Sequence, residues 1–449
     1  MENNTYRTNA DVIIIGAGGA GLTAAFTAYE GGKSVILLEK DQKVGGNTLC
    51  AHMGINAAGV DVQEANPEYV EAEAGVEGLE ALQLNNERAH KELVKVFAEN
   101  SGKMAALYQR LGVEFKSMVS RDPRNKTANY YMLLSKGGKT ATVMVNAIYE
   151  AIQKTDIALY TGMDAREILT DVDGNVCGIR AVDEQGEEIC FEASKVILCT
   201  GGFGQNRAYV AKVAPRLANA ITDEMAPTSG DGIFMAEALG AQAVDLDQIQ
   251  TFPHVIDKFG MVNPGILPGG FRTSAVYVNA DAKRFTKEGF EIVEAALAQK
   301  DGAIYSIFSE ADCNNNLKKM AADGWIFEAD SAKELAGRLG LDSDALEETV
   351  KEWNAACAAG EDKDFGNDVL HPLTGKLYGY RFGIGVHFCC GGILINEKTH
   401  VLKADGSPIP GLYAAGEVTG GFHGTRRVDG SGTGDAFAFG YIAGKQMLA

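Results

Sequence analysis

The amino-terminal part of the chain alternates short apolar runs with glycine-rich turns. Residues 11–15 (DVIII) form a nearly continuous β-branched run, which is typical of a strand buried on both faces of a parallel sheet. A glycine-rich turn follows at 16–21, an alanine-rich segment at 22–31 predicts a helix, and residues 34–39 predict a second buried strand. This order of strand, helix and strand predicts a βαβ unit.

The hydrophobic pattern divides the later part of the chain into strands of a sheet and an inserted segment. Apolar runs at 195–199 and 411–415 each lead into glycine, as a strand does where a ligand approaches the backbone. The stretch between them shows helical patterns instead, at 332–339 and 344–356. We therefore expect two domains, a sheet domain formed by 1–246 and 389–449 and an inserted domain formed by 247–388.

The first glycine-rich turn carries the pattern Gly16-x-Gly18-x-x-Gly21. In such a turn the first glycine permits the tight bend, the second lets the main chain approach a pyrophosphate, and the third allows close packing of helix on strand. The phosphates then lie at the helix N-terminus, where free N–H groups favour negative charge. Glu39 follows Gly21 by 18 residues, at a strand end where it can accept hydrogen bonds from ribose. The context predicts a dinucleotide site, and a plain glycine turn is the alternative.

Three further segments narrow the kind of dinucleotide. They are a second glycine-rich loop at 45–57, the sequence TGGF at 200–203 and the sequence PGLYAAGE at 410–417. Together with the first turn, they resemble the flavoprotein family that includes soluble fumarate reductases, urocanate reductase, the succinate dehydrogenase flavoprotein and, more distantly, 3-ketosteroid dehydrogenases. The resemblance extends over essentially the whole chain. It implies an α/β fold, with a Rossmann-like FAD-binding domain built on a parallel sheet and an inserted α+β capping domain.

The resemblance also implies which residues contact FAD. Members that bind FAD covalently use a histidine one residue before the threonine of the second loop, and here that position is Asn47, so we expect noncovalent FAD. Glu417 is expected at the ribityl chain and the main chain near Ala165 at the adenine. The full set of expected cofactor-binding residues is Gly16, Gly18, Gly19, Ala20, Gly21, Glu39, Lys40, Gly46, Asn47, Thr48, Ala57, Ala165, Thr200, Gly201, Gly202, Asp231, Gly416, Glu417, Gly432 and Thr433.

Composition and charge exclude several other classes of function. The formal net charge is -19, from 41 basic and 60 acidic residues, which disfavours nucleic acid and anionic lipid as partners. The eight cysteines show no spacing typical of a metal or iron–sulfur site, so no metal is expected. The polar first ten residues lack a signal pattern, and no apolar run is long enough to span a bilayer. We expect a cytoplasmic protein without a membrane span.

Two residues correspond to the pair that grips one substrate carboxylate in this family. They are Arg427 and His387, and a guanidinium fork matches a carboxylate with two hydrogen bonds. Binding of this kind withdraws electron density from an adjacent C=C bond and makes it a better hydride acceptor. A surface ion pair is the alternative for Arg427, and a satisfied core histidine is the alternative for His387, which lies among Phe388, Cys389 and Cys390. His423 is expected to brace the backbone.

The other half of the family's substrate site is altered. Phe252 stands where the family has a histidine for the second carboxylate, although His254 follows two residues later. Ile292 occupies the position of the family's proton-donating arginine. Without that acid a fumarate reductase would lose on the order of 100- to 10,000-fold in rate. We expect a substrate other than fumarate, with an aromatic or bulky apolar group.

The proton donor has several candidates. Arg272 corresponds, with a one-residue gap, to an arginine that helps to relay protons in relatives, and a solvated charge is the alternative. Tyrosines perform this task in the ketosteroid branch, and the candidates here are Tyr130, Tyr131, Tyr277 and Tyr378. Each of these tyrosines is individually more typical of packing. The predicted catalytic set is Arg427, His387, Arg272 and Tyr378.

These observations predict an FAD-dependent oxidoreductase that acts on CH–CH groups. The first hypothesis is an ene-reductase, which transfers hydride from flavin N5 to an alkene conjugated with a carboxylate or carbonyl. The second is a dehydrogenase or oxidase that desaturates a CH–CH bond next to a ketone, as the 3-ketosteroid enzymes do. A non-catalytic flavin-binding protein is the third. The chain shows no haem-attachment motif, so a separate electron donor or acceptor is expected.

Overall fold

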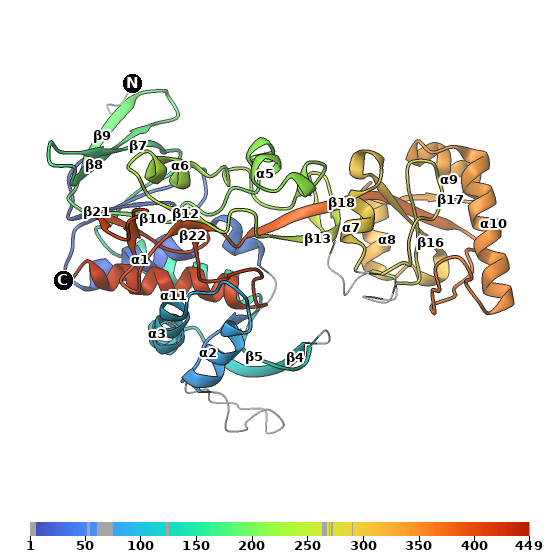
Figure 1. Cartoon of the computed structure of the whole chain (residues 1–449), viewed down its shortest axis with the longest axis horizontal. Helices are drawn as coiled ribbons and strands as arrows, with labels where there is room; N and C mark the ends of the chain where they lie inside the picture. The colour runs from blue at the N-terminus through green and yellow to red at the C-terminus, as the bar shows by residue number, and fades with distance from the viewer. Residues whose placement is uncertain are drawn as a thin grey trace. The chain divides into compact units, whose positions relative to one another are not determined.

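The computed structural model describes residues 6–51, 54–60, 75–122, 125–262, 267–268, 270, 273–289 and 291–448, and within 116–131 the backbone alone. The chain forms two compact units. The first unit comprises Met1–Asn206, Met225–Gln250 and Phe388–Ala449, and the second comprises Arg207–Glu224 and Thr251–His387. Figure 1 labels the helices and strands of both units.

The main sheet of the first unit is built from short strands, and its three central strands are fully buried. In the described part of this unit, six strands lie in the order β20-β21-β10-β1-β2-β6. All neighbours are parallel except β20 and β21. All four residues of β1 are buried, as expected for a parallel sheet whose two faces are covered by other elements. The bounds are β20 His400–Leu402, β21 Pro408–Ala414, β10 Val196–Leu198, β1 Val12–Ile15, β2 Val35–Leu38 and β6 Ala158–Tyr160.

Helices and smaller sheets complete the first unit. Helix α1 (Gly19–Glu30) lies beside α11 (Ser431–Gln446), from the far end of the chain (Figure 1). The other helices are α2 Val76–Leu84, α3 Lys91–Arg110, α4 Thr140–Ile152 and α6 Asp231–Glu237. Three smaller sheets are formed by β3 Ile55–Asn56 with β5 Asn125–Ser135 and β4 Phe115–Asp122, by β7 Asp164–Thr170 with β8 Val176–Val182 and β9 Glu188–Glu192, and by β12 Ala243–Val244 with β19 Gly392–Leu394 and β22 Thr419–Gly420.

The second unit is organised around the long strand β18 (Leu377–Cys389). Strands β13, β16, β11 and β17 pair with it, β14 pairs with β13, and β15 pairs with β16. Two apolar clusters fill its core, and one of them contains Ile292, Tyr277, Tyr378 and Tyr380. The strand bounds are β11 Ile221–Thr222, β13 Ile249–Ile256, β14 Gly260–Met261, β15 Val276–Val278, β16 Ile304–Ser309 and β17 Phe327–Ala329. The helices are α5 Arg207–Val213, α7 Val293–Leu297, α8 Asn315–Ala322, α9 Ala332–Leu339 and α10 Ser343–Ala359.

The α/β fold with a parallel sheet was predicted and is confirmed. The predicted βαβ unit corresponds to β1, α1 and β2, and the later apolar runs correspond to β10 and β21. The helix predicted at 332–339 is present and is capped at its start, since the Ser331 side chain accepts a hydrogen bond from the Glu334 amide. The two units differ from the expected domains at three places. Residues 207–224 belong to the second unit, where β11 pairs with β18, and residues 247–250 and 388 belong to the first unit.

The helices do not have the character of membrane spans. None of those within the described ranges is both long and apolar enough to cross a lipid bilayer. The longest, α3, has 20 residues but carries several charged side chains, including Lys91 and Glu92 in its first turn.

Candidate active site

The first glycine-rich turn is held in its shape by contacts that exclude side chains. Gly16 follows β1 with a φ of +98°, in the left-handed region that favours glycine. A Cβ on Gly21 would overlap the carbonyl oxygen of Gly16, so any side chain at position 21 would push helix α1 away from the strand. The close approach of helix and strand that the sequence predicted is therefore present.

The start of α1 is left open at the second glycine. Gly18 is the N-cap residue of α1 and makes no side-chain cap hydrogen bond, and a Cβ there would meet no atom closer than 3.8 Å. Nearby, the Gly19 amide donates to Thr48 Oγ1 (3.1 Å), and the Gly45 amide donates to the Ala17 carbonyl (2.8 Å). The two glycine-rich loops are thus fastened together beside an uncovered helix N-terminus, which is the arrangement that binds phosphate groups.

Glu39 is hydrogen-bonded to two backbone amides of the first unit. Its Oε2 accepts a hydrogen bond from the Ala17 amide (2.8 Å), and its Oε1 accepts one from the Asp41 amide (2.8 Å). The side chain is buried, and this burial raises the pKa of the carboxyl group despite those amides. In this structure Glu39 braces the glycine turn, and a role toward ribose stays a prediction.

Other predicted cofactor residues form a polar network in the same unit. Lys40 Nζ lies 2.8 Å from Asp231 Oδ2, which joins two of the predicted cofactor residues. The side chain of Asn47 is engaged at both ends, because its Oδ1 accepts from the Met225 amide (2.7 Å) and its Nδ2 donates to Thr228 Oγ1 (3.2 Å).

The remaining predicted cofactor residues lie mostly at the ends of strands and helices of this unit. Thr200, Gly201 and Gly202 follow β10, and Gly416 and Glu417 follow β21, its parallel neighbour. Glu417 Oε1 accepts a hydrogen bond from the Cys389 amide (2.8 Å). The rest are Ala57 after β3, Ala165 in β7, and Gly432 and Thr433 in the first turn of α11. The structure gathers all of the predicted cofactor residues in the first unit.

Arg427 is held close to the start of α11. Its Nε donates to Gln250 Oε1 (2.7 Å), and its guanidinium carbon lies 5.0 Å from the centre of the Phe388 ring. A Cβ on Gly432 would come within 2.7 Å of Arg427 Cδ, so the side chain packs directly against the helix backbone. Arg427 is thus partly buried beside Gly432, a predicted cofactor residue, and among the described residues its side chain contacts an amide oxygen and an aromatic ring.

His387 forms a different cluster, in the second unit. Its Nδ1 lies 2.8 Å from Asp223 Oδ2, and its ring lies 4.5 Å from the Phe252 ring, centre to centre. The exposed fraction of the side chain is 27% for His387 and 8% for Asp223. The imidazole is thus anchored by a covered carboxylate and remains partly accessible itself, which differs from a satisfied core histidine.

The candidate proton donors differ in how far the structure describes them and in what surrounds them. Tyr378 is buried and stacks on Phe308, and burial raises the pKa of its phenol to about 12. It also lies nine positions before His387 in β18, which at about 3.3 Å per residue separates the two by roughly 30 Å. We therefore leave Tyr378 out of the proposed site. Arg272 lies outside the described residues, as do the side chains of Tyr130 and Tyr131.

The two positions that depart from the family pattern, Phe252 and Ile292, carry apolar side chains. Ile292 is 2% exposed and belongs to an apolar cluster of the second unit, so it is core. His254 is 1% exposed, and its two ring nitrogens are bonded to Tyr380 Oη (2.9 Å) and Tyr277 Oη (2.7 Å). His254 therefore does not replace the missing histidine, and Tyr277 is a partner of this buried residue.

Two residues of these clusters were missed by sequence reasoning. Gln250 lies in the same segment as Phe252 but was not predicted to have a role, and Asp223 was not singled out at all. No local motif marks either residue, since each acts through a partner more than 160 positions away in the chain. His423, predicted to brace the backbone, is buried with its Nε2 3.1 Å from Asp435 Oδ2 in the next helix.

Comparisons with known proteins bear on the identity of the chain. The model of the family described as "FAD binding domain" matches residues 11–433. This chain belongs to that family. The predicted fold and the predicted cofactor FAD are confirmed with it, and at the level of its family the protein is an FAD-dependent oxidoreductase.

Among its relatives are several named reductases. The protein is 33% identical to fumarate reductase (cytochrome) of Shewanella frigidimarina over 97% of this chain and 76% of the relative. It is 31% identical to NADH:fumarate oxidoreductase of Klebsiella pneumoniae over 99% of this chain and 48% of the relative. A third, NADH:acrylate oxidoreductase of Vibrio harveyi, is 28% identical over 99% of this chain and 51% of the relative. The chain thus spans about half the length of two of these relatives.

A solved structure is similar over the whole chain. It is the open conformation of a flavocytochrome c3 fumarate reductase, with a TM-score of 0.87 and 27% identity, covering 99% of this chain and 78% of the other. The residues of the first unit also fit the binding of FAD. The uncovered N-terminus of α1 can take the pyrophosphate, because Gly18 presents no Cβ to it.

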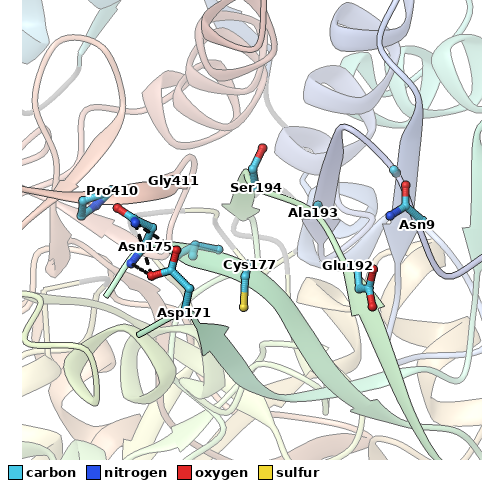
Figure 2. Close-up of a pocket in the computed structure, with 11 residues that line it drawn as sticks. Asn9, Asp171, Asn175, Cys177, Glu192, Ala193, Ser194, Pro410 and Gly411 are labelled. Atoms are coloured by element: carbon cyan, nitrogen blue, oxygen red, sulfur yellow. Dashed lines mark hydrogen bonds between the residues drawn. The ribbon is translucent and has the colours of Figure 1, made fainter. Parts of the chain in front are cut away.

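An open pocket of the first unit lies apart from these residues. It is lined by β8, β9 and β21 and includes Asp171, Asn175 and Cys177 (Figure 2). The Asp171 carboxylate is already used within its own turn, where it accepts hydrogen bonds from the Asn175 side chain. None of the predicted catalytic or cofactor-binding residues lines this pocket, so it is not the candidate active site.

Proposed function

We propose that this protein is an ene-reductase that uses FAD to reduce a C=C bond conjugated with a carboxylate or carbonyl. The observation that carries the proposal is the position of Arg427, whose side chain packs against Gly432, a predicted cofactor residue, at the N-terminus of α11. The Gln250 contact uses Nε, and the Nη groups of the guanidinium are the atoms proposed to bind the substrate's carboxylate. The named reductases among the relatives support the reaction class.

The cofactor supplies hydride to the substrate when it is bound in the reduced state. The chain's own residues bind, orient and polarise. Gln250 and Phe388 hold the Arg427 guanidinium in place before the substrate arrives, so little side-chain freedom is lost on binding. Its positive charge then stabilises the negative charge that develops on the carboxylate or carbonyl as the hydride adds. His387, which directly precedes Phe388 in β18, is the second residue proposed to act on the substrate.

We propose a monocarboxylate or enone with an apolar group, such as an aryl acrylate, in place of fumarate. Fumarate has a second carboxylate, and the two family positions that would serve it or protonate its alkene are Phe252 and Ile292 here. Phe252 lies against the His387 ring, where an aromatic or aliphatic substituent would be favoured over a charged one. The relative named NADH:acrylate oxidoreductase supports a substrate with a single carboxylate.

The test is an anaerobic reaction of the reduced holoprotein with a panel of alkenes. Acrylates and enones with apolar substituents should reoxidise the flavin rapidly, and fumarate should do so much more slowly. Arg427→Gln should lower the rate with acrylates by roughly 100-fold or more, because it removes a charge-assisted carboxylate contact. Arg426→Gln, which changes the adjacent exposed arginine, is the matched control. Reduction of oxidised flavin by saturated ketones, with no reoxidation by any alkene, would instead establish the desaturating direction.

We also propose that FAD is bound noncovalently and that the electrons come from a separate donor. Asn47 occupies the position of the family's linking histidine, and both ends of its side chain are engaged by the 225–228 loop. Acid precipitation should release all of the flavin into the supernatant, and flavin that stays with the pellet would refute the first part. The names of two relatives pair their reaction with NADH or a cytochrome, so both kinds of donor should be tried.

The proposed location is the cytoplasm. All eight cysteines of the sequence lie in the described residues and none of them forms a disulfide there. Recovery of the native protein in the periplasmic fraction of its source cells would contradict this proposal.

A further inference from the structure

A short strand from a distant part of the chain brings an acid to His387. Strand β11 runs parallel to β18, with Ile221 opposite Gly385 and Thr222 opposite Val386. The Val386 carbonyl accepts hydrogen bonds from the Asp223 amide (3.3 Å) and from Thr222 Oγ1 (3.1 Å). These contacts fix the backbone on both sides of the pair, so the carboxylate of Asp223 meets the next residue of β18, His387.

The carboxylate determines which imidazole nitrogen carries a proton. Asp223 Oδ2 lies 2.8 Å from His387 Nδ1, and an ionised carboxylate only accepts hydrogen bonds. Nδ1 is therefore the protonated nitrogen of the neutral ring, and Nε2 is the atom that gains or releases a proton. Asp223 is mostly covered, whereas the imidazole keeps 27% of its side-chain surface exposed. In this arrangement the covered carboxylate of Asp223 orients the imidazole of His387, which stays accessible for acid–base chemistry.

The surroundings of the second carboxylate oxygen of Asp223 are not those expected of an ion pair that only stabilises the fold. Asp223 Oδ1 is buried and has no hydrogen-bond partner among the described residues. A buried carboxylate oxygen without a partner is costly, and such groups in native proteins call for an explanation, often a functional one. Within the described residues, Phe252 on β13 contacts the imidazole with an apolar ring, and Asp223 contacts it with a carboxylate.

Several other groups within the described residues that could carry the proton are engaged elsewhere, and Arg272 lies outside those residues. The position of the family's donor is Ile292, and Tyr378 lies far along β18. Both nitrogens of His254 are bonded to phenols inside the core. His371 makes a pair with Asp312 at a similar distance (2.9 Å), but its side chain is 55% exposed and it belongs to the surface. His387 is the described histidine of this unit with an anchored Nδ1 and a partly covered ring.

We propose that Asp223 and His387 form an acid–base dyad in which His387 transfers the substrate's proton and Asp223 is a positioning residue. The inference rests on the proposed function. In reduction, one alkene carbon takes a hydride from reduced FAD, the two-electron donor, and the neighbouring carbon forms a C–H bond with the proton on Nε2. The Nε2–H bond breaks, its electron pair stays on the imidazole, and water returns the proton. In desaturation the neutral Nε2 accepts the proton.

The experiment compares variants of the reduced holoprotein by the rate of flavin reoxidation with an active acrylate across a range of pH. His387→Gln should lower the rate by about 100- to 10,000-fold, the usual contribution of general acid–base catalysis. Asp223→Asn should lower kcat by at least tenfold with little change in KM and displace the pH profile, and Asp223→Glu should restore part of both. His371→Gln, which removes the surface pair, should behave as the wild type. Unchanged kcat in Asp223→Asn would overturn the dyad.

Two further readouts separate this proposal from the proposed function. Binding of a saturated carboxylate product, seen as a change in the oxidised flavin spectrum, should survive in Asp223→Asn and His387→Gln. Loss of that binding would show that His387 is a carboxylate anchor and would overturn the dyad, whereas a wild type that binds and reduces nothing would refute the proposed function.

Nitrogen-15 NMR of the histidine rings tests the pair without any substrate. The signal absent from His387→Gln should show a protonated Nδ1 in the wild type and a changed tautomer in Asp223→Asn. A ring that is protonated only at Nε2, or that is unaffected by Asp223→Asn, would overturn the dyad whatever the enzyme reduces. Retained FAD and an unchanged unfolding temperature serve as the check that each variant is folded.

Discussion

The glycine-rich turn of the first unit and the histidines of the second unit contribute to the proposed function through different atoms. In the turn, the essential atoms belong to the backbone, and what matters is the absence of side chains at Gly16, Gly18 and Gly21. In the second unit the essential atoms belong to side chains, and the same residue type takes opposite roles. Sequence patterns reveal the first kind of site directly, because spacing alone defines it, and reveal the second kind poorly.

The two histidines of the second unit illustrate the difference. His254 is fully buried between Tyr277 and Tyr380 and stacks on Phe382 with ring centres 4.2 Å apart. Burial lowers the pKa of its imidazole to about 3, so it stays neutral. His387 has a carboxylate partner and an accessible ring. A phenol partner and complete burial make a structural histidine, and a carboxylate partner with partial access makes a candidate for proton transfer.

The largest effect is expected when Gly21 of the glycine-rich turn is replaced by alanine. Gly21→Ala should abolish retention of FAD, because the new Cβ would overlap the Gly16 carbonyl and displace α1 from β1. The measurement is the ratio of bound flavin to protein after gel filtration. Gly174→Ala is the matched control, since Gly174 lies in a surface turn with a φ of +82° and a Cβ there would meet no atom within 4 Å. That control should cost about 1 kcal/mol and leave FAD bound.

A smaller but distinct effect is expected at the buried histidine. His254→Leu leaves the hydroxyl groups of Tyr277 and Tyr380 without their partner in an apolar core, which should lower the free energy of unfolding by about 2 to 5 kcal/mol. Urea unfolding followed by fluorescence measures the change. His371→Leu, at an exposed position, should change stability by less than about 0.5 kcal/mol. Equal effects of the two substitutions would remove the contrast between buried and accessible histidines.

The pH dependence of stability should give a smaller effect that also tests the contrast between the buried His254 and the accessible histidines. In the unfolded chain the His254 imidazole binds a proton near pH 6.5, but in the folded protein its pKa is about 3. Its contribution is therefore fully present above pH 6.5 and is lost as the pH falls from 6.5 toward 3, by up to about 1.4 kcal/mol per pH unit. Urea unfolding at several pH values should show this slope in the wild type and a smaller slope in His254→Leu.

A second group should act in a separate, more acidic window. Arg284 hydrogen bonds lower the pKa of the Asp362 carboxyl to about 2 from its ordinary 3.8. The stability contributed by this pair is present above pH 3.8 and is lost as the pH falls from 3.8 toward 2. Arg284→Met should remove this lower window and leave the window of His254 in place. A single unbroken slope in that variant would contradict the assignment of the two groups.

The elements that sequence patterns predicted well were those specified by local chemistry. The βαβ unit needed only a buried strand, a glycine turn and an alanine-rich helix, and the capped helix α9 needed only Ser331 and Glu334. The domain bounds were harder, because segment 207–224 joins the second unit through the pairing of β11 with β18, which no local pattern indicates. Tyr378 and His387 lie nine positions apart in one strand, and the surroundings of each were set by segments that the local pattern does not indicate.

By itself, the sequence determined that this chain binds a dinucleotide and that an arginine and a histidine near its end are candidates for substrate contact. The tertiary structure decided what surrounds each of them, including Gln250 at Arg427 and Asp223 at His387. The physical reason is distance along the chain. A backbone cradle is encoded within a few consecutive residues, whereas the partner and burial of a side chain depend on segments that meet only when the chain has folded.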